Sequence, residues 1–224
     1  MPFPAPIRAV LLDMDGTLLD TETIYVGSMF AALADMGLHL EQSLVHAMIG
    51  LPGQECMALL RDSFAERFQY KEFQPIYVAH RSQRMQGGIP LKPGTVELLD
   101  LIDAAGIKVA VATSSNRDNA HTNLANAGLL PRFAAVLTRD DVAAAKPHPA
   151  LFLRAAAALG ADPAACLAVE DSHVGVRAAH AAGTMTVMVP DMLPPTDEIR
   201  ALCLHVVPDL HAVAALFRQA GMAP

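Results

Sequence analysis

Short apolar segments alternate with segments of helical periodicity along most of this chain. The apolar segments are rich in Val, Ile, Leu and Ala and are too short for typical helices, so we interpret them as buried β-strands. They lie at residues 7–13, 107–113, 133–138, 166–170 and 184–189. A helical segment precedes each of the last four, at residues 95–105, 117–127, 149–159 and 173–182. This alternation predicts an α/β fold with a parallel sheet covered by helices on both faces.

Residues 21–88 interrupt the alternation. Their apolar side chains recur at helical spacing in residues 24–36, 42–49, 54–68 and 72–85, without a convincing strand. We therefore expect two domains. One is an α/β core of residues 1–20 and 89–224, and the other is an all-helical domain of residues 21–88 inserted after the first strand.

Composition and charge exclude several classes of protein. A chain of 224 residues with 53% hydrophobic residues can bury a core and is far from the composition of disordered proteins. Sixteen Lys and Arg against 23 Asp and Glu give a formal charge of -7, and the basic residues form no cluster that could follow a nucleic-acid backbone. No segment approaches a membrane span, and the three cysteines lack the spacing of a zinc site. We expect a cytoplasmic protein whose partners include neither nucleic acid nor a membrane.

The strongest chemical signal is the segment DMDGT at residues 13–17, where the first apolar segment ends. Alternate residues of a strand point to opposite faces, so a strand that stops near Gly16 frees both Asp13 and Asp15 for one site. A calcium loop of the EF-hand type would need Asp or Asn, Gly and Glu at its fifth, sixth and twelfth positions. Those positions hold Thr, Leu and Ile here. An EF-hand loop is therefore disfavoured, and an ordinary acidic turn is the simpler alternative.

This segment resembles the first motif, DxDxT, of the haloacid dehalogenase (HAD) superfamily, and of the members that carry a helical cap after that motif. Three further elements follow in the family's order, and each lies at the end of a predicted strand or in the next loop. They are Thr113 in VATSSN, Lys146 in AAKPHP and Glu170-Asp171 in AVEDS. Each alone has a simpler interpretation, such as a helix cap, a surface lysine or a loop start. Together they imply a Rossmann-like parallel-sheet core with an inserted all-helical cap domain.

The resemblance also implies a magnesium-dependent phosphoryl transfer. Mg²⁺ would be bound by the Asp13 carboxylate, the Asp15 backbone carbonyl and Asp171, with Glu170 acting through water. Asp13 would attack phosphorus in line to give an aspartyl phosphate, while Asp15 would protonate the leaving oxygen and later activate water. An acid at Asp15 favours phosphoryl transfer over dehalogenation, because a halide leaves without protonation.

The remaining implied residues would bind the phosphoryl group. Thr113 and the Ser114 amide would hold phosphoryl oxygens, and Lys146 would balance charge on these oxygens and on Asp13. A phosphate monoester carries about -1.5 to -2 charges at pH 7, so an attacking carboxylate is repelled unless positive charge is close. In an open parallel sheet, ligands bind beyond the carboxyl ends of the strands, so we expect these residues to meet there.

Residues of the helical insert distinguish a phosphatase from a phosphomutase. By resemblance to β-phosphoglucomutase, a mutase would carry a His where this chain has Tyr25, and an Arg where this chain has Gly53 after Gly50-Leu51-Pro52. We therefore predict a phosphatase that hydrolyses a small phosphorylated metabolite, such as a sugar phosphate or a phosphoglycolate-like compound. The alternatives are a phosphomutase of the β-phosphoglucomutase type and a non-catalytic binding protein with the same fold. Arg81 and Arg84 either bind a distal anion of the substrate or belong to a solvated helix face.

Overall fold

The computed structural model describes residues 2–48 and 53–221. The chain divides into two compact units. One consists of Met1–Asp20 and Pro90–Pro224, and the other of Thr21–Ile89. The amide of Asp20 donates a hydrogen bond to the carbonyl of Pro90 at 2.8 Å, so the two segments of the first unit meet where the chain leaves and returns.

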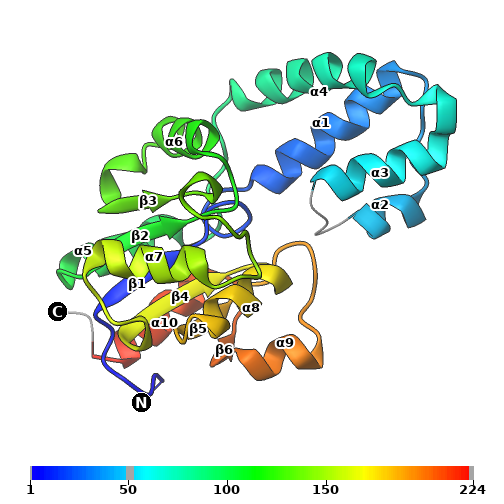
Figure 1. Ribbon diagram of the computed structural model, residues 1–224. Helices are drawn as coiled ribbons and strands as arrows, with labels where there is room; N and C mark the ends of the chain where they lie inside the picture. Colours follow the sequence, from blue (N-terminus) through cyan, green and yellow to red (C-terminus); the bar gives the residue numbers. More distant parts are fainter. Residues whose placement is uncertain (1, 49–52, 222–224) are drawn as a thin grey trace. The chain divides into compact units, whose positions relative to one another are not determined.

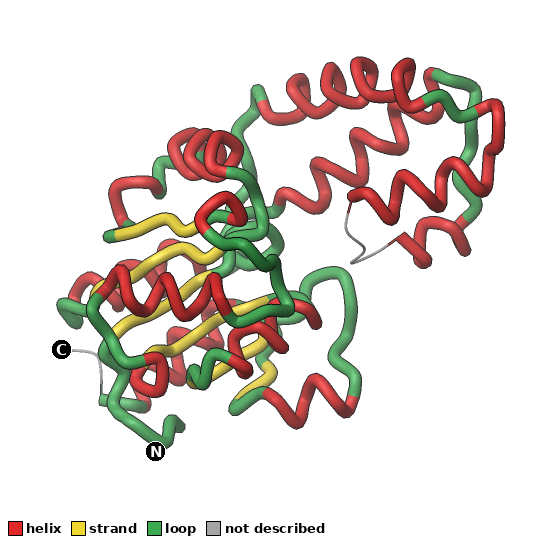
Figure 2. Tube along the Cα trace, viewed as in Figure 1, coloured by secondary structure: helices red, strands yellow, loops and turns green. Residues whose placement is uncertain are grey.

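The first unit contains a sheet of six strands in the order β3-β2-β1-β4-β5-β6 (Figures 1 and 2). Every neighbouring pair is parallel, which confirms the predicted α/β fold. The strands are β1 (Ala9–Leu12), β2 (Lys108–Ala112), β3 (Ala135–Leu137), β4 (Cys166–Glu170), β5 (Met185–Met188) and β6 (His205–Val206). The first five fall within the predicted segments. The sixth has two residues and was not predicted, because so short a strand has no detectable periodicity.

Helices cover the sheet on both faces. Those of this unit are α5 (Thr95–Ala104), α6 (Arg117–Asn126), α7 (Ala150–Leu159), α8 (His173–Ala181), α9 (Asp197–Leu202) and α10 (Leu210–Gln219). Small side chains of β1, β2 and β4 form one apolar cluster with α7 and α8. The alternate residues of the same strands point to the other face, where α5 contacts both β2 and α10. Helices α9 and α10 were not predicted.

The second unit is entirely helical in its described residues. It contains α1 (Thr21–Asp35), α2 (Gln42–Met48), α3 (Gly53–Phe64), a 3-10 turn (Ala65–Arg67) and α4 (Tyr70–Met85). Helix α1 packs against α4, and α2 against α3. The centre of the unit is one apolar cluster formed by Ala32, Leu33, Leu38, Met48, Leu60, Phe68 and Phe73. Gly53, which was used above against a mutase, begins α3, and residues 50–52 before it lie outside the described residues.

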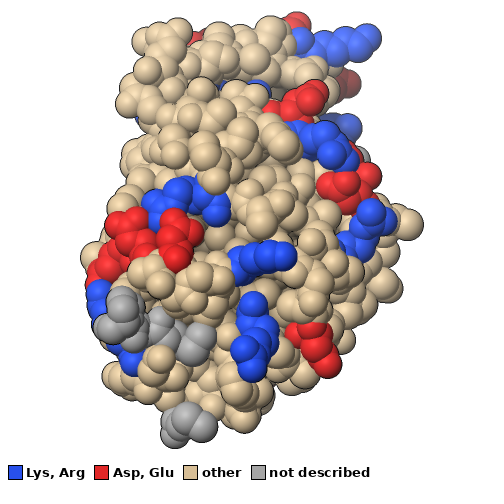
Figure 3. All heavy atoms as spheres, turned by 90° about the vertical axis from the view of Figure 1, so that its left-hand side faces the viewer, with Lys and Arg blue, Asp and Glu red and all other residues tan. Residues whose placement is uncertain are grey.

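The structure also describes charged side chains on the surface and the state of the cysteines. On the face drawn in Figure 3, acidic and basic side chains form small mixed groups separated by uncharged surface. Within the described part of the chain, Cys56, Cys166 and Cys203 form no disulfide. Among the described residues, no helix combines the length and hydropathy needed to cross a membrane.

Candidate active site

The carboxyl ends of three adjacent strands carry the predicted site residues. Asp13 follows β1, Thr113 follows β2, and Glu170 ends β4. Strand β1 lies between the other two, and its register is extended by a hydrogen bond from the Asp13 amide to the Val169 carbonyl at 3.0 Å. Parallel pairing therefore brings these side chains together, although Asp13 and Glu170 are more than a hundred residues apart in the sequence. In open α/β sheets, ligands bind at this end of the strands.

A buried lysine joins two of these strand ends. The Lys146 ammonium lies 2.6 Å from Asp13 Oδ1 and 2.5 Å from Glu170 Oε1. The exposed fractions of the three side chains are 3%, 7% and 0%, so these charges are sheltered from water. The same ammonium lies 5.0 Å from the centre of the Phe152 ring in α7. Lys146 is thus fixed from both sides and holds Asp13 in place.

Both carboxylate oxygens of Glu170 have hydrogen-bond partners. Its Oε2 accepts hydrogen bonds from the amides of Asp171 and Ser172 and from the Ser172 hydroxyl, at 3.0 to 3.1 Å. Ser172 also caps α8 by accepting from the amide of Gly175. A side chain at Gly175 would overlap the Glu170 carboxylate, so only glycine leaves space for it. Glu170 therefore supports Lys146 and the start of α8, with little freedom to turn toward a ligand.

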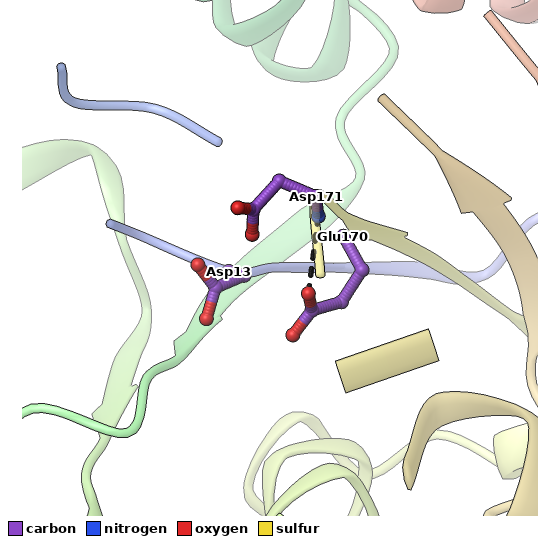
Figure 4. A group of neighbouring side chains, drawn as sticks. All are labelled: Asp13, Glu170 and Asp171. Atoms are coloured by element: carbon purple, nitrogen blue, oxygen red, sulfur yellow. Dashed lines mark hydrogen bonds between the residues drawn. The ribbon is translucent and has the colours of Figure 1, made fainter. Parts of the chain in front are cut away.

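Three carboxylates form the possible metal site. Asp13, Glu170 and Asp171 each offer an oxygen, and these oxygens lie within 4.8 Å of one another (Figure 4). Asp171 also receives a long hydrogen bond of 3.4 Å from the Thr17 hydroxyl. Gly16 has a φ of +84°, and a Cβ there would lie only 2.5 Å from Asp171 Oδ2. The loop of the DMDGT segment can pass this close to Asp171 because Gly16 has no side chain.

Asp15 is oriented by two hydroxyl groups from the loop after β2. Its Oδ2 accepts from Thr113 Oγ1 at 3.1 Å and from Ser115 Oγ at 2.8 Å. The Ser115 amide in turn donates to Thr113 Oγ1 at 3.0 Å. Ser114, the other predicted phosphate-binding residue, is exposed. Sequence analysis missed Ser115, although its place two residues after Thr113 in the run TSSN was an available signal.

The burial of these groups changes their acidity. Burial raises the pKa of Asp13 to about 8; Lys146 opposes this rise, and repulsion from Glu170 and Asp15 adds to it. Burial also raises the pKa of Asp171 well above its usual range, helped by Glu170 and Asp13. Burial alone would lower the pKa of Lys146, but Asp13 and Glu170 raise it above its usual value. One lysine does not balance two buried carboxylates and the partly buried carboxylate of Asp171, so the cluster favours an additional cation.

Another prediction concerned two arginines of the helical unit. In α4, the Arg81 guanidinium carbon lies 6.0 Å from the centre of the Tyr77 ring. The Arg84 guanidinium lies 3.2 Å from where a Cβ of Gly27 would be, so it rests against α1. Both arginines thus contact their own unit, and their contact with a substrate stays a prediction. His148 Nδ1 accepts from the Ala150 amide at 3.2 Å, which gives this histidine a role in shaping the loop before α7.

Comparisons with known proteins agree with this arrangement. Residues 7–183 match the model of the haloacid dehalogenase-like hydrolases. Protein CbbY of Rhodobacter capsulatus is 31% identical over 218 residues, which cover 93% of this chain and 96% of that protein. The phosphorylated carbohydrates phosphatase of Thermotoga maritima is 28% identical, over 79% of this chain and 82% of the phosphatase. A solved structure of a HAD family hydrolase from Deinococcus radiodurans, with bound phosphate and sodium, has a TM-score of 0.82 and 29% identity over 98% of both chains.

Proposed function

This chain belongs to the haloacid dehalogenase-like hydrolase family, and from that premise we propose that it is a Mg²⁺-dependent phosphatase whose nucleophile is Asp13. Its substrate is a small phosphorylated metabolite, such as a sugar phosphate or a phosphoglycolate-like compound. The observation that carries the proposal is the sheltered contact of 2.6 Å between Asp13 and Lys146 beside the carboxylate of Asp171. This contact holds a nucleophile and a positive charge at the point where a phosphoryl group would bind.

The residues present fit a divalent cation. Asp13 and Asp171 offer oxygens at the carboxyl ends of β1 and β4, and the Asp15 backbone carbonyl is the third proposed ligand. Oxygen ligands with room for several waters are those that Mg²⁺ prefers. Glu170 is committed to Lys146 and to the start of α8, so it would act on the cation through water. When bound, the cation neutralises charge on the phosphoryl oxygens and on Asp13.

Asp13 and Asp15 carry out the two steps of the reaction. In the first step, an oxygen of the Asp13 carboxylate bonds to phosphorus, the bond from phosphorus to the leaving oxygen breaks, and Asp15 gives that oxygen a proton. In the second step, Asp15 takes a proton from water, whose oxygen then bonds to phosphorus and releases Asp13. The products are an alcohol and inorganic phosphate. This is nucleophilic catalysis combined with general acid and base catalysis.

The groups that bind the phosphoryl group are Thr113, the Ser114 amide and Lys146. The Thr113 hydroxyl has one proton, which it donates to Asp15 in this structure. It must therefore change its partner when it donates to a phosphoryl oxygen. Lys146 lies next to the attacking oxygen, where its charge offsets the charge that builds up during attack.

The substrate class is proposed from chemistry and from the relatives together. An acid at Asp15 suits an alkoxide leaving group, as in a phosphate monoester of a sugar or hydroxy acid. The Thermotoga maritima relative is named as a phosphatase of phosphorylated carbohydrates. Tyr25, where a mutase would carry a His, supports water as the acceptor of the phosphoryl group.

Hydrolysis of p-nitrophenyl phosphate tests the reaction class. We expect turnover with Mg²⁺, none with EDTA, and a loss of about four orders of magnitude or more in Asp13→Asn, since removal of a nucleophile typically has effects of this size. Asp62→Asn is the matched control, because Asp62 is exposed on α3 and the exchange is chemically the same. Rates that do not depend on metal, or equal rates in Asp13→Asn, would refute the proposal.

A second experiment separates hydrolysis from isomerisation. The enzyme is supplied with glucose 1-phosphate and a glucose bisphosphate primer. Free phosphate is the product expected of a phosphatase. Accumulation of glucose 6-phosphate would instead identify a phosphomutase.

A further inference from the structure

A second charged pair lies beside the acidic cluster and has no role in the proposed reaction. Lys92 Nζ and Asp191 Oδ1 are 2.7 Å apart, although the two residues are 99 positions apart in the chain. Their side chains are only 20% and 13% exposed. In the sequence, Lys92 follows the helical unit and precedes α5, and Asp191 lies in the loop after β5. Exposed ion pairs contribute little to stability, but a sheltered pair fixes the orientation of both groups.

The other oxygen of Asp191 faces the candidate metal site. Among the residues that the structure describes, the buried Asp191 Oδ2 finds no hydrogen-bond partner. A Cβ built on Gly16 would lie 3.0 Å from this oxygen and 2.5 Å from Asp171 Oδ2. Oxygens of both aspartates therefore border the same small space over the Gly16 backbone. A buried carboxylate oxygen normally accepts a hydrogen bond from a donor, and the described residues supply none to this oxygen.

Lys92 is itself attached to the loop that carries Asp15. Its amide donates to the Leu18 carbonyl at 2.9 Å, and its carbonyl accepts from the Thr95 hydroxyl at 2.8 Å. The Thr95 hydroxyl also contacts the Leu18 carbonyl, at 3.1 Å. The lysine backbone is thus held against the DMDGT loop, and its side chain sets where Asp191 points.

We propose that Asp191 is a positioning residue for the divalent cation, and that Lys92 holds it in place. Asp191 Oδ2 accepts a hydrogen bond from the hydration shell of the cation that Asp13 and Asp171 bind, and Lys92 occupies the other oxygen. This inference rests on the proposed metal dependence. Mg²⁺ retains several waters when it binds proteins, and groups that accept from such outer ligands tune metal affinity.

Binding of Mn²⁺ to the full chain without substrate tests this role, with free Mn²⁺ measured by electron paramagnetic resonance. We expect Asp191→Asn to weaken Mn²⁺ binding about 10- to 100-fold, the usual effect of losing an outer-shell partner. With Lys92 donating to its carbonyl, the Asn side chain would turn an N–H group toward the hydration shell, where an acceptor is needed. Asp62→Asn, the exposed control, should bind Mn²⁺ as the parent does.

Lys92→Met distinguishes a role of Lys92 in orienting Asp191 from an effect of the Asp191 charge alone. This variant also tests the proposal if Asp191→Asn fails to fold. If Lys92 holds Asp191 in place, its loss weakens Mn²⁺ binding. If Asp191 contributes only negative charge, loss of a positive neighbour strengthens Mn²⁺ binding, and the positioning role is refuted. Parental affinity in Asp191→Asn refutes it as well. Asp171→Asn keeps the two proposals apart: if Asp171→Asn binds Mn²⁺ like the parent, the proposed metal site itself is wrong.

Discussion

The α/β unit and the helical unit bury different kinds of side chain. Among the described residues, the α/β unit buries Asp13 and Glu170 completely or nearly so, together with the ammonium of Lys146. Among the residues of the helical unit whose burial is described, the buried polar ones are Thr21 and Ser28, which carry no charge. Burial of charge costs free energy unless partners are placed closely around it. Holding the proposed active site therefore lowers the stability of the α/β unit, whereas the helical unit is stabilised by one apolar cluster.

Because of this difference, we expect mutations in the two units to have different effects. In the α/β unit, removal of a charge should alter stability, metal binding and catalysis together, because the same contacts serve all three. In the helical unit, removal of apolar volume should alter stability without altering the metal site. The following variants are ordered from the largest expected effect to the smallest.

Lys146→Met should have the largest effect. It leaves Asp13 and Glu170 buried without their shared cation, which typically costs about 3–5 kcal/mol of unfolding free energy. Loss of its charge from the reaction centre should also lower kcat by about a hundred- to a thousandfold. Urea unfolding in EDTA and p-nitrophenyl phosphate hydrolysis measure the two effects. Lys108→Met at the exposed start of β2 is the control, and equal results for the two variants would contradict the role of Lys146.

Phe73→Ala tests the helical unit. Phe73 is 2% exposed and lies in the apolar cluster, so truncation should cost about 3–5 kcal/mol of the stability of this unit. Circular dichroism during urea unfolding measures the loss. Mn²⁺ affinity at low urea should stay at the parental value, because the proposed ligands belong to the other unit. Phe30→Ala, at an exposed phenylalanine of α1, should cost about 1 kcal/mol or less. A large loss of Mn²⁺ affinity in Phe73→Ala would show that the two units are not separable in this way.

The pH dependence of stability tests the burial of Asp13. Its pKa is about 8 in the folded chain, far above the ordinary value of 3.8. Between these values the folded state binds a proton that the unfolded state lacks, so this group's contribution to stability is lost as the pH rises toward 8. We expect the metal-free protein to lose about 2–3 kcal/mol between pH 6 and pH 8 in urea unfolding. Asp13→Asn should lose the part of this dependence that comes from Asp13 and keep the part that comes from the raised pKa of Asp171, and a parent whose stability rises relative to Asp13→Asn over this range would contradict the prediction.

Ser115→Ala should have the smallest effect. It removes one of the two hydroxyl groups that orient Asp15, and a single hydrogen bond of this kind contributes about 1 kcal/mol. We expect kcat to fall about fivefold, since Thr113 still holds Asp15. Ser114→Ala is the neighbouring control, because the proposed role of Ser114 uses its amide, which alanine retains. A larger loss in Ser114→Ala than in Ser115→Ala would reverse the assignment of the two serines.

Sequence analysis succeeded where local pattern decides structure. The five longer strands and the four helices predicted in the α/β unit follow from periodicity within short windows. The two-residue strand β6 and the six-residue helix α9 are too short to leave such a pattern. Helix α10 does have an apolar face, with Val213 and Phe217 buried, and the sequence-based prediction overlooked it.

The amino-acid sequence by itself determined the α/β fold, the helical insert and the residue types available for chemistry. These properties depend on periodicity and on motifs within a few residues of each other. Only the tertiary structure decided which groups share a site. The contacts of Ser115 with Asp15 and of Lys92 with Asp191 arise from parallel strand pairing and from loops that meet at one edge of the sheet. The physical reason is that such contacts join residues up to a hundred positions apart, where no local pattern records the partner.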